Sequence, residues 1–124
     1  MLSPRRSTNT VLVCAQNSRT YIILTMAHEI VGGTIQNLIA EASNNIANNI
    51  DFSGDGPISN GQFNWLGDDE VHLEVWNTNN HQATWGVVNA ALSALADYMS
   101  SHFYGAAFFT NKDGANEVGE GVIG

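Results

Sequence analysis

The spacing of apolar residues after Gly33 switches between two periods, and this switch limits the folds that are open to the chain. Between Ile35 and Ile50 the apolar residues recur every three or four positions, which predicts an amphipathic helix. Residues 51–61 then contain three glycines and a proline, which end a helix and turn the chain. On both sides of a turn at residues 67–69, apolar and polar residues alternate, which predicts a β-hairpin.

The same order of periods is repeated in the second half of the chain. Thr84 is of a residue type that caps helices, and the apolar residues that follow it share one helical face. These residues are Trp85, Val88, Leu92, Leu95 and Met99. Two further alternating segments, 104–110 and 117–123, flank an Asp113-Gly114 pair that is common in hairpin turns. The chain after Gly33 therefore has the order helix, hairpin, helix, hairpin.

This order predicts an α+β domain. Two helices would pack on one face of a four-stranded, mostly antiparallel sheet, because each element must bury its apolar side against another. The segment Tyr21 to Thr25 could add a fifth strand. Residues 1–19 show no clear period, so we expect a poorly ordered N-terminal extension followed by a single domain over residues 20–124.

The charges are distributed unevenly, and this excludes two classes of partner. Lys112 is the only lysine or arginine after Arg19, whereas all twelve carboxylates lie at or after Glu29, so residues 27–124 have a formal charge of -11. Phosphate backbones and anionic lipid headgroups are bound by clusters of cations. We therefore expect neither a nucleic acid nor a membrane as partner.

Cys14 is the only cysteine, so no disulfide can form within the chain. A reducing compartment fits this usage best. The N-terminal residues also lack the continuous apolar stretch of a signal peptide. We expect a cytoplasmic protein, and a secreted one only if the N-terminus is wrongly assigned.

Two segments of the second half resemble a known group of sequences. They are residues 77–87, Asn-Thr-Asn-Asn-His-Gln-Ala-Thr-Trp-Gly-Val, and residues 113–121, Asp-Gly-Ala-Asn-Glu-Val-Gly-Glu-Gly. In these segments the chain is similar to small uncharacterised fungal α/β proteins, and the resemblance covers about Trp76 to Gly124. Many such proteins begin with a secretion signal, to which this chain has no good match. The resemblance implies no catalytic residue and no ligand.

The segment from Asp51 to Gln62 is similar to the calcium loop of an EF-hand. Oxygen-bearing side chains occupy positions 1, 3, 5 and 9, and glycine occupies position 6. Position 12, however, is Gln62 where a bidentate glutamate is needed, and a strand follows where a helix should begin. A polar turn is therefore favoured over a weak calcium-binding module at residues 51–62. We expect no metal ligands and no cofactor.

His72, Glu74 and Trp76 should lie on one side of their predicted strand. If the helices cover the other side, this triplet faces solvent, and an exposed tryptophan among polar groups is typical of a contact surface. The favoured hypothesis is a non-catalytic binding protein whose partner is a protein, a small ligand or a second copy in a homodimer. The binding residues would be His72, Glu74 and Trp76.

A small hydrolase-like or isomerase-like enzyme is the alternative hypothesis. It would use the His72 and Glu74 pair, or Glu120, as acid or base. Glu120 shares a predicted strand side with Val118 and Val122, so an inward orientation would bury its carboxylate, as at many catalytic sites. A bulge at Gly119 or Gly121, or a position on an edge strand, would expose it to water, and we favour the bulge.

Overall fold

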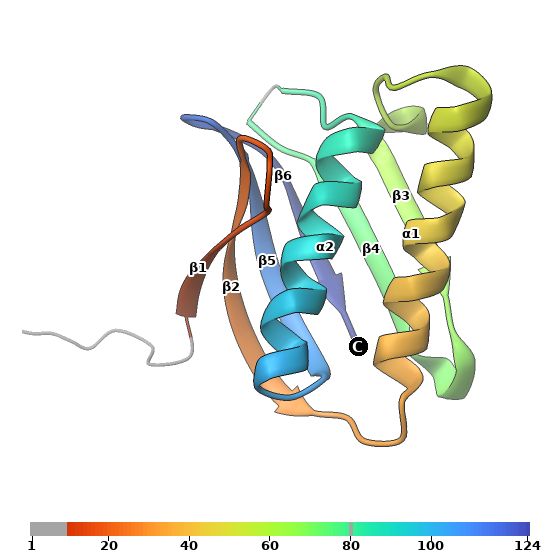
Figure 1. Ribbon diagram of the computed structural model, residues 1–124, viewed down its shortest axis with the longest axis vertical. Helices are drawn as coiled ribbons and strands as arrows, with labels where there is room; N and C mark the ends of the chain where they lie inside the picture. Colours follow the sequence, from red (N-terminus) through yellow and green to blue (C-terminus); the bar gives the residue numbers. More distant parts are fainter. Residues whose placement is uncertain (1–9, 80) are drawn as a thin grey trace, which may run out of the picture.

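Hairpins and helices alternate along the chain in the computed structural model, which describes residues 10–79 and 81–124 (Figure 1). The first hairpin precedes the first helix, a second hairpin separates the two helices, and a third follows the second helix. The elements are β1 (Thr10–Cys14), β2 (Thr20–Glu29), α1 (Thr34–Ser53), β3 (Gln62–Leu66), β4 (His72–Asn77), α2 (Trp85–Ser101), β5 (Gly105–Asp113) and β6 (Asn116–Ile123). The predicted order of helix, hairpin, helix and hairpin is confirmed, with one more hairpin in front of it.

All six strands form one sheet in the order β1-β2-β5-β6-β4-β3, and every neighbouring pair is antiparallel. The α+β class and the antiparallel pairing agree with the prediction, whereas the predicted number of four to five strands is too low. Strand β6 lies between β5 and β4. It therefore joins the β3–β4 hairpin to the rest of the sheet.

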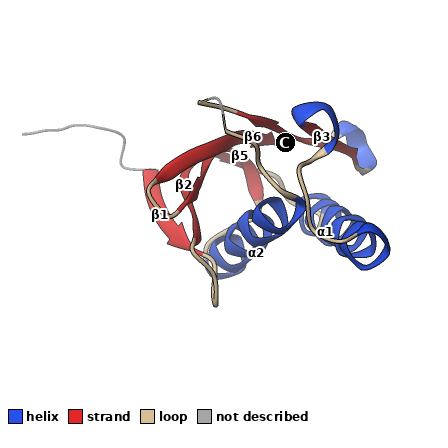
Figure 2. Ribbon diagram, turned by 90° about the horizontal axis from the view of Figure 1, so that it is seen from above, coloured by secondary structure: helices blue, strands red, loops and turns tan. Residues whose placement is uncertain are grey.

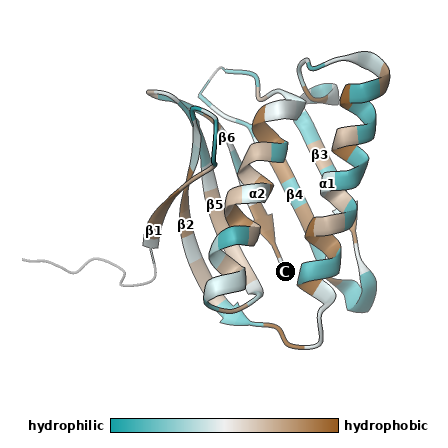
Figure 3. Ribbon diagram, in the orientation of Figure 1, coloured by the Kyte–Doolittle hydropathy of each residue, from teal (hydrophilic) through white to brown (hydrophobic). Residues whose placement is uncertain are grey.

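Both helices cover the same face of the sheet, as the sequence predicts (Figure 2). Figure 3 shows hydrophobic segments in both the sheet and the helices. Along β2, β4 and β5, buried residues that face the helices alternate with more exposed ones. Ile22 and Leu24 of β2, Leu73 of β4 and Phe109 of β5 are fully buried on this side. The helices contribute Ile35, Leu38, Ile39, Ala42 and Ile46 from α1 and Val88, Ala91, Leu92, Ala94, Leu95 and Met99 from α2. The hydrophobic core is thus the layer between the sheet and the helices.

The segment that the sequence assigned to a poorly ordered extension contains part of the sheet. Thr10–Cys14 is strand β1, which pairs along its whole length with β2. Val11 and Val13 pack against the core, whereas Leu12 points the other way. The expectation of a loose extension over residues 1–19 is therefore corrected for Thr10–Cys14, and residues 1–9 lie outside the described residues.

The ring of Phe109 on β5 lies against Gly121 on β6, on the helix side of the sheet. Gly121 lies directly opposite Phe109, and a side chain at this position would overlap with the phenyl ring. The Phe109 ring therefore occupies the space that a side chain at position 121 would need.

The helices were also compared with the requirements for a membrane span. Among the described helices, neither is long and apolar enough to cross a membrane.

Candidate functional site

Strand β4 presents the predicted triplet on the face of the sheet that the helices leave uncovered. Leu73 and Val75 are buried under the helices, and His72, Glu74 and Trp76 alternate with them on the other side. We call this uncovered side the open face. The strand period predicted the side of all three residues, because Leu73 and Val75 are buried on the other side of β4 and thereby fix the pairing register.

His72 and Glu74 lie close together on this face. The His72 Nε2 atom is 3.7 Å from the Glu74 Oε1 atom, and the two side chains are 41% and 44% exposed. At this exposure water screens the pair, so it contributes little to stability. The pair positions two polar groups beside Trp76 without forming an enclosed site.

Trp76 is partly buried, which differs from the expectation of a solvated indole. Its directly opposed neighbours are Gln62 on β3 and Glu120 on β6. Side chains in such opposed positions have Cβ atoms about 5 Å apart, which is close enough for them to contact the ring. More exposed apolar area comes from residues that the sequence prediction did not include.

A stripe of apolar side chains crosses the open face from β1 to β4, with one residue from each of five adjacent strands. Its members lie directly opposite or diagonally next to one another in the strand registers. We call this set the apolar stripe, and it consists of Leu12, Ile23, Phe108, Val122 and Trp76. Leu12 is 60% exposed and Phe108 is 40% exposed, whereas Ile23, Val122 and Trp76 are partly buried.

One sequence signal could have identified Phe108. Phe108 and Phe109 are consecutive residues of a strand, so their side chains must point to opposite faces. Only one of them can enter the core, and the other must be exposed on an uncovered face. Leu12 carried no such signal, because the segment around it is apolar on both sides.

Two carboxylates lie near Trp76, at the β4 end of the apolar stripe. Glu120 lies opposite both Trp76 and Thr110, and Glu74 lies opposite Val122. At the far end of β5 and β6, Glu117 is paired in register with Lys112. The open face therefore combines an apolar centre with acidic groups next to its tryptophan.

Glu120 is partly exposed, so its carboxylate is not buried in the core. Glu120 and Val122 both lie on the open face, so the glutamate is not inward-facing. The register of β5 and β6 shifts next to Val118, which is buried, and Glu120 lies beyond this irregularity. The sheet therefore has an irregularity next to Gly119, as predicted. The Glu120 carboxylate is exposed, however, because neither of the described helices covers the open face.

The loop that resembles a calcium site connects α1 to β3 and contacts the beginning of α2. Asp51 and Ser53 lie in the last turn of α1, while the Asp55 Oδ1 atom accepts a hydrogen bond from the Gly86 backbone N–H at 2.9 Å. A methyl group at Gly86 would collide with the Asp55 carboxylate, so glycine permits this approach. Among the described residues, no group of three or more histidine, cysteine, aspartate or glutamate side chains could hold a metal ion.

The N-terminus of α2 has partners for its backbone N–H groups. Thr84 accepts from the Val87 N–H through its Oγ1 atom at 3.2 Å, which confirms the predicted cap. The N–H of Trp85 donates to the Gly56 carbonyl oxygen, and that of Val88 donates to the Thr84 carbonyl oxygen. Together with Asp55 on Gly86, these contacts hold the start of the helix against the loop.

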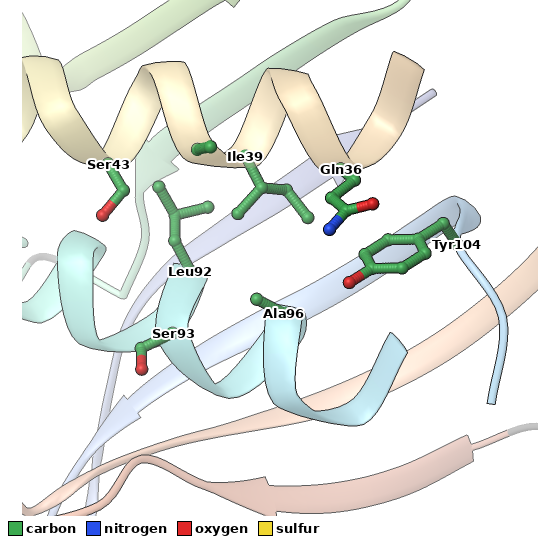
Figure 4. Close-up of a pocket in the computed structure, with 8 residues that line it drawn as sticks. Gln36, Ile39, Ser43, Leu92, Ser93, Ala96 and Tyr104 are labelled. Atoms are coloured by element: carbon green, nitrogen blue, oxygen red, sulfur yellow. The ribbon is translucent and has the colours of Figure 1, made fainter. Parts of the chain in front are cut away.

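A depression of about 310 Å³ lies between the two helices, on the side away from the sheet (Figure 4). Ile39 of α1 and Leu92 of α2 line it, and Gln36 lies next to Tyr104 at one end. A second depression of about 320 Å³ shares Gln36 and Tyr104 and continues along the β2–α1 loop. Sequence reasoning did not predict either depression, and His72, Glu74 and Glu120 line neither of them.

Comparisons with known proteins add no further guide to function. A scan against protein-family models and searches of curated proteins and of solved structures found no match to the chain. The surfaces of the molecule itself must therefore indicate its function.

Proposed function

We propose that the chain is a non-catalytic binding protein that contacts a partner protein through its open face, with Trp76 as the main contact. The observation that supports this proposal is the apolar stripe. Its five side chains are contributed by five neighbouring strands and form one continuous line across the sheet. Exposed apolar residues scattered singly are ordinary, whereas a contiguous patch with a polar rim is typical of interaction sites.

The shape of the open face favours a protein over a small ligand. Small molecules are usually bound in concave pockets that bury most of their surface. The two depressions described above are lined by residues of the helices and nearby loops, and no residue of the apolar stripe lines them. An extended stripe on a sheet is better matched by an equally extended partner surface.

The composition of the face also resembles that of interface centres. Aromatic residues are enriched there, and a few of them usually account for most of the binding free energy. Trp76 and Phe108 are the aromatic members of the stripe, while polar Gln62 and Thr110 lie around them. His72 and Glu74 then contribute to the rim of the same site.

A displayed peptide library selected on the folded chain would test this proposal. Most of the selected peptides should bind Trp76→Ala at least about 30-fold more weakly, which corresponds to a loss of about 2 kcal/mol. Phe52→Ala provides the matched control, since Phe52 is 92% exposed at the end of α1 and lies outside the stripe. Circular dichroism and denaturant titration should show that both variants keep the fold.

Two results would contradict the proposal. One is that the selected peptides bind Trp76→Ala as tightly as the original chain but are lost with Tyr104→Ala, which would place the contact site between the helices. The other is a sharp loss of stability for Trp76→Ala, which would make the indole part of the core.

A further inference from the structure

We infer that the partner segment on the open face is positively charged, and that an arginine side chain of this segment lies over Trp76 between Glu74 and Glu120. This inference rests on the proposed function, because it specifies the chemistry of the partner at the same site. The strand registers bring the charges that support it together on this face.

The two carboxylates flank the tryptophan in the sheet. Glu120 is directly opposite Trp76 on the neighbouring strand, and Glu74 is two residues from Trp76 on the same side of β4. Both carboxylates are therefore within one side-chain length of the indole. A flat cation over the ring could contact the π face and donate hydrogen bonds to both carboxylates at once.

Arginine suits this arrangement better than lysine. Its guanidinium group is planar, stacks on aromatic rings and presents several N–H donors in fixed directions. Charge-assisted hydrogen bonds to carboxylates are stronger than neutral ones, and they would set the position of the partner. The apolar stripe beyond Trp76 would then contact the neighbouring side chains of the same segment.

Lys112 of β5 is paired in register with Glu117, away from the tryptophan. His72 lies 3.7 Å from Glu74, so one of the two carboxylates next to Trp76 has an imidazole beside it. Glu120, in contrast, has Thr110 and Trp76 as its opposed neighbours. Neither residue directly opposite Glu120 is therefore a cation.

The overall charge favours a basic partner over a second copy of the chain. Residues 27–124 carry twelve carboxylates against one lysine, which gives a strongly negative field around the domain. In a two-fold dimer through the open face, the same patch would meet itself, and carboxylates of both copies would come together. Like charges in opposed positions are destabilising, whereas a basic segment is attracted from a distance.

The test uses two synthetic peptides of the same length, one with alternating threonine and arginine and one with citrulline in place of arginine. Citrulline keeps the shape of the side chain and removes its charge. The isotope-labelled chain is titrated with each peptide, and the changes in its backbone NMR signals are mapped. We expect the arginine peptide to shift signals of β4, β6 and β5 and to bind at least tenfold more tightly than the citrulline peptide.

Matched variants separate a local site from a general attraction of charge. Glu120→Gln should weaken binding of the arginine peptide at least fivefold, since it removes a carboxylate next to Trp76. Asp97→Asn removes one charge from the exposed side of α2, and it should change the affinity less than twofold.

The outcomes distinguish failure of this inference from failure of the proposed function. Equal binding of both peptides at the open face would overturn the arginine site and leave the contact surface in place, as would equal weakening by Glu120→Gln and Asp97→Asn. Signal changes confined to the helices would overturn both proposals. A dimer in sedimentation that Trp76→Ala dissociates would show that the occupant is a second copy.

Discussion

Phe108 and Phe109 are consecutive residues of one strand, yet they have opposite environments. Phe109 is fully buried beneath the helices and lies against Gly121, whereas Phe108 is 40% exposed on the open face opposite Val122. The amino acid is the same, so the difference comes only from which side of the sheet each residue occupies. The covered face determines stability, and the uncovered face is available for contact.

Strand β4 shows the same division with different residue types. Leu73 and Val75 are almost fully buried, while His72, Glu74 and Trp76, which alternate with them, are only partly buried. A sheet with helices on one face only is stable without a partner on the other, because antiparallel sheets tolerate water on one side. The apolar stripe on the open face is therefore more than the fold itself requires.

The largest expected effect compares the two phenylalanines directly. Phe109→Ala should lower the free energy of unfolding by about 3 to 5 kcal/mol, because it removes a buried ring and leaves a cavity. Phe108→Ala should lower it by less than about 1 kcal/mol, since part of that ring is already in water. Urea titration of the two variants measures both values. Equal losses would show that the two faces do not differ as described.

A smaller effect is expected at Gly121, against which the Phe109 ring packs on the covered face. Gly121→Ala should cost about 1 to 3 kcal/mol, because the new methyl group overlaps with the Phe109 ring and forces it to move. Gly56→Ala is the control, since a methyl group there meets no atom within 4 Å, and its change should stay within about 0.5 kcal/mol. Thermal unfolding would compare them. A neutral Gly121→Ala would mean that the ring has free space.

The helix layer also depends on how α2 begins. Thr84→Ala should cost about 1 kcal/mol, because it removes the side-chain acceptor for the Val87 N–H. Thr84→Ser keeps the hydroxyl group and should retain most of the stability. Denaturant titration of both variants would show whether the hydroxyl is responsible; equal losses would assign the effect to the methyl group.

The smallest expected effect concerns the loop at residues 51–62. Millimolar calcium or EDTA should leave the melting temperature unchanged, because Gln62 lacks the carboxylate that the twelfth position needs and Asp55 contacts Gly86. Differential scanning calorimetry with and without calcium measures this. A marked rise with calcium would show a third functional region, separate from both faces of the sheet.

Much of the fold could be predicted because its signals are local. The helical period of residues 35–50 and the alternation of Leu73 and Val75 with their neighbours are present within single elements. Strand β1 could not be predicted in this way, since Val11, Leu12 and Val13 are apolar on both sides of the strand. Its place depends on pairing with β2, which sequence periodicity does not encode.

The candidate site was predicted only in its β4 part, for a similar reason. Trp76 and its two neighbours follow from the period of one strand. The apolar stripe depends on the registers of five strands, and these place Leu12 and Phe108 in line with Val122. The depression between the helices likewise depends on how α1 and α2 pack, so Gln36 and Tyr104 gave no signal in the sequence.

The strand in the middle of the sheet, β6, is also the last of the described strands to leave the ribosome. Until Asn116–Ile123 is synthesised, β3 and β4 share no backbone ladder with the group formed by β1, β2 and β5. Two open edges, on β4 and β5, would meanwhile be free to pair with other chains. We therefore expect the sheet to close only after translation of β6, at a rate limited by contacts between distant parts of the chain. A nascent chain halted before Asn116 would be the form most prone to aggregate.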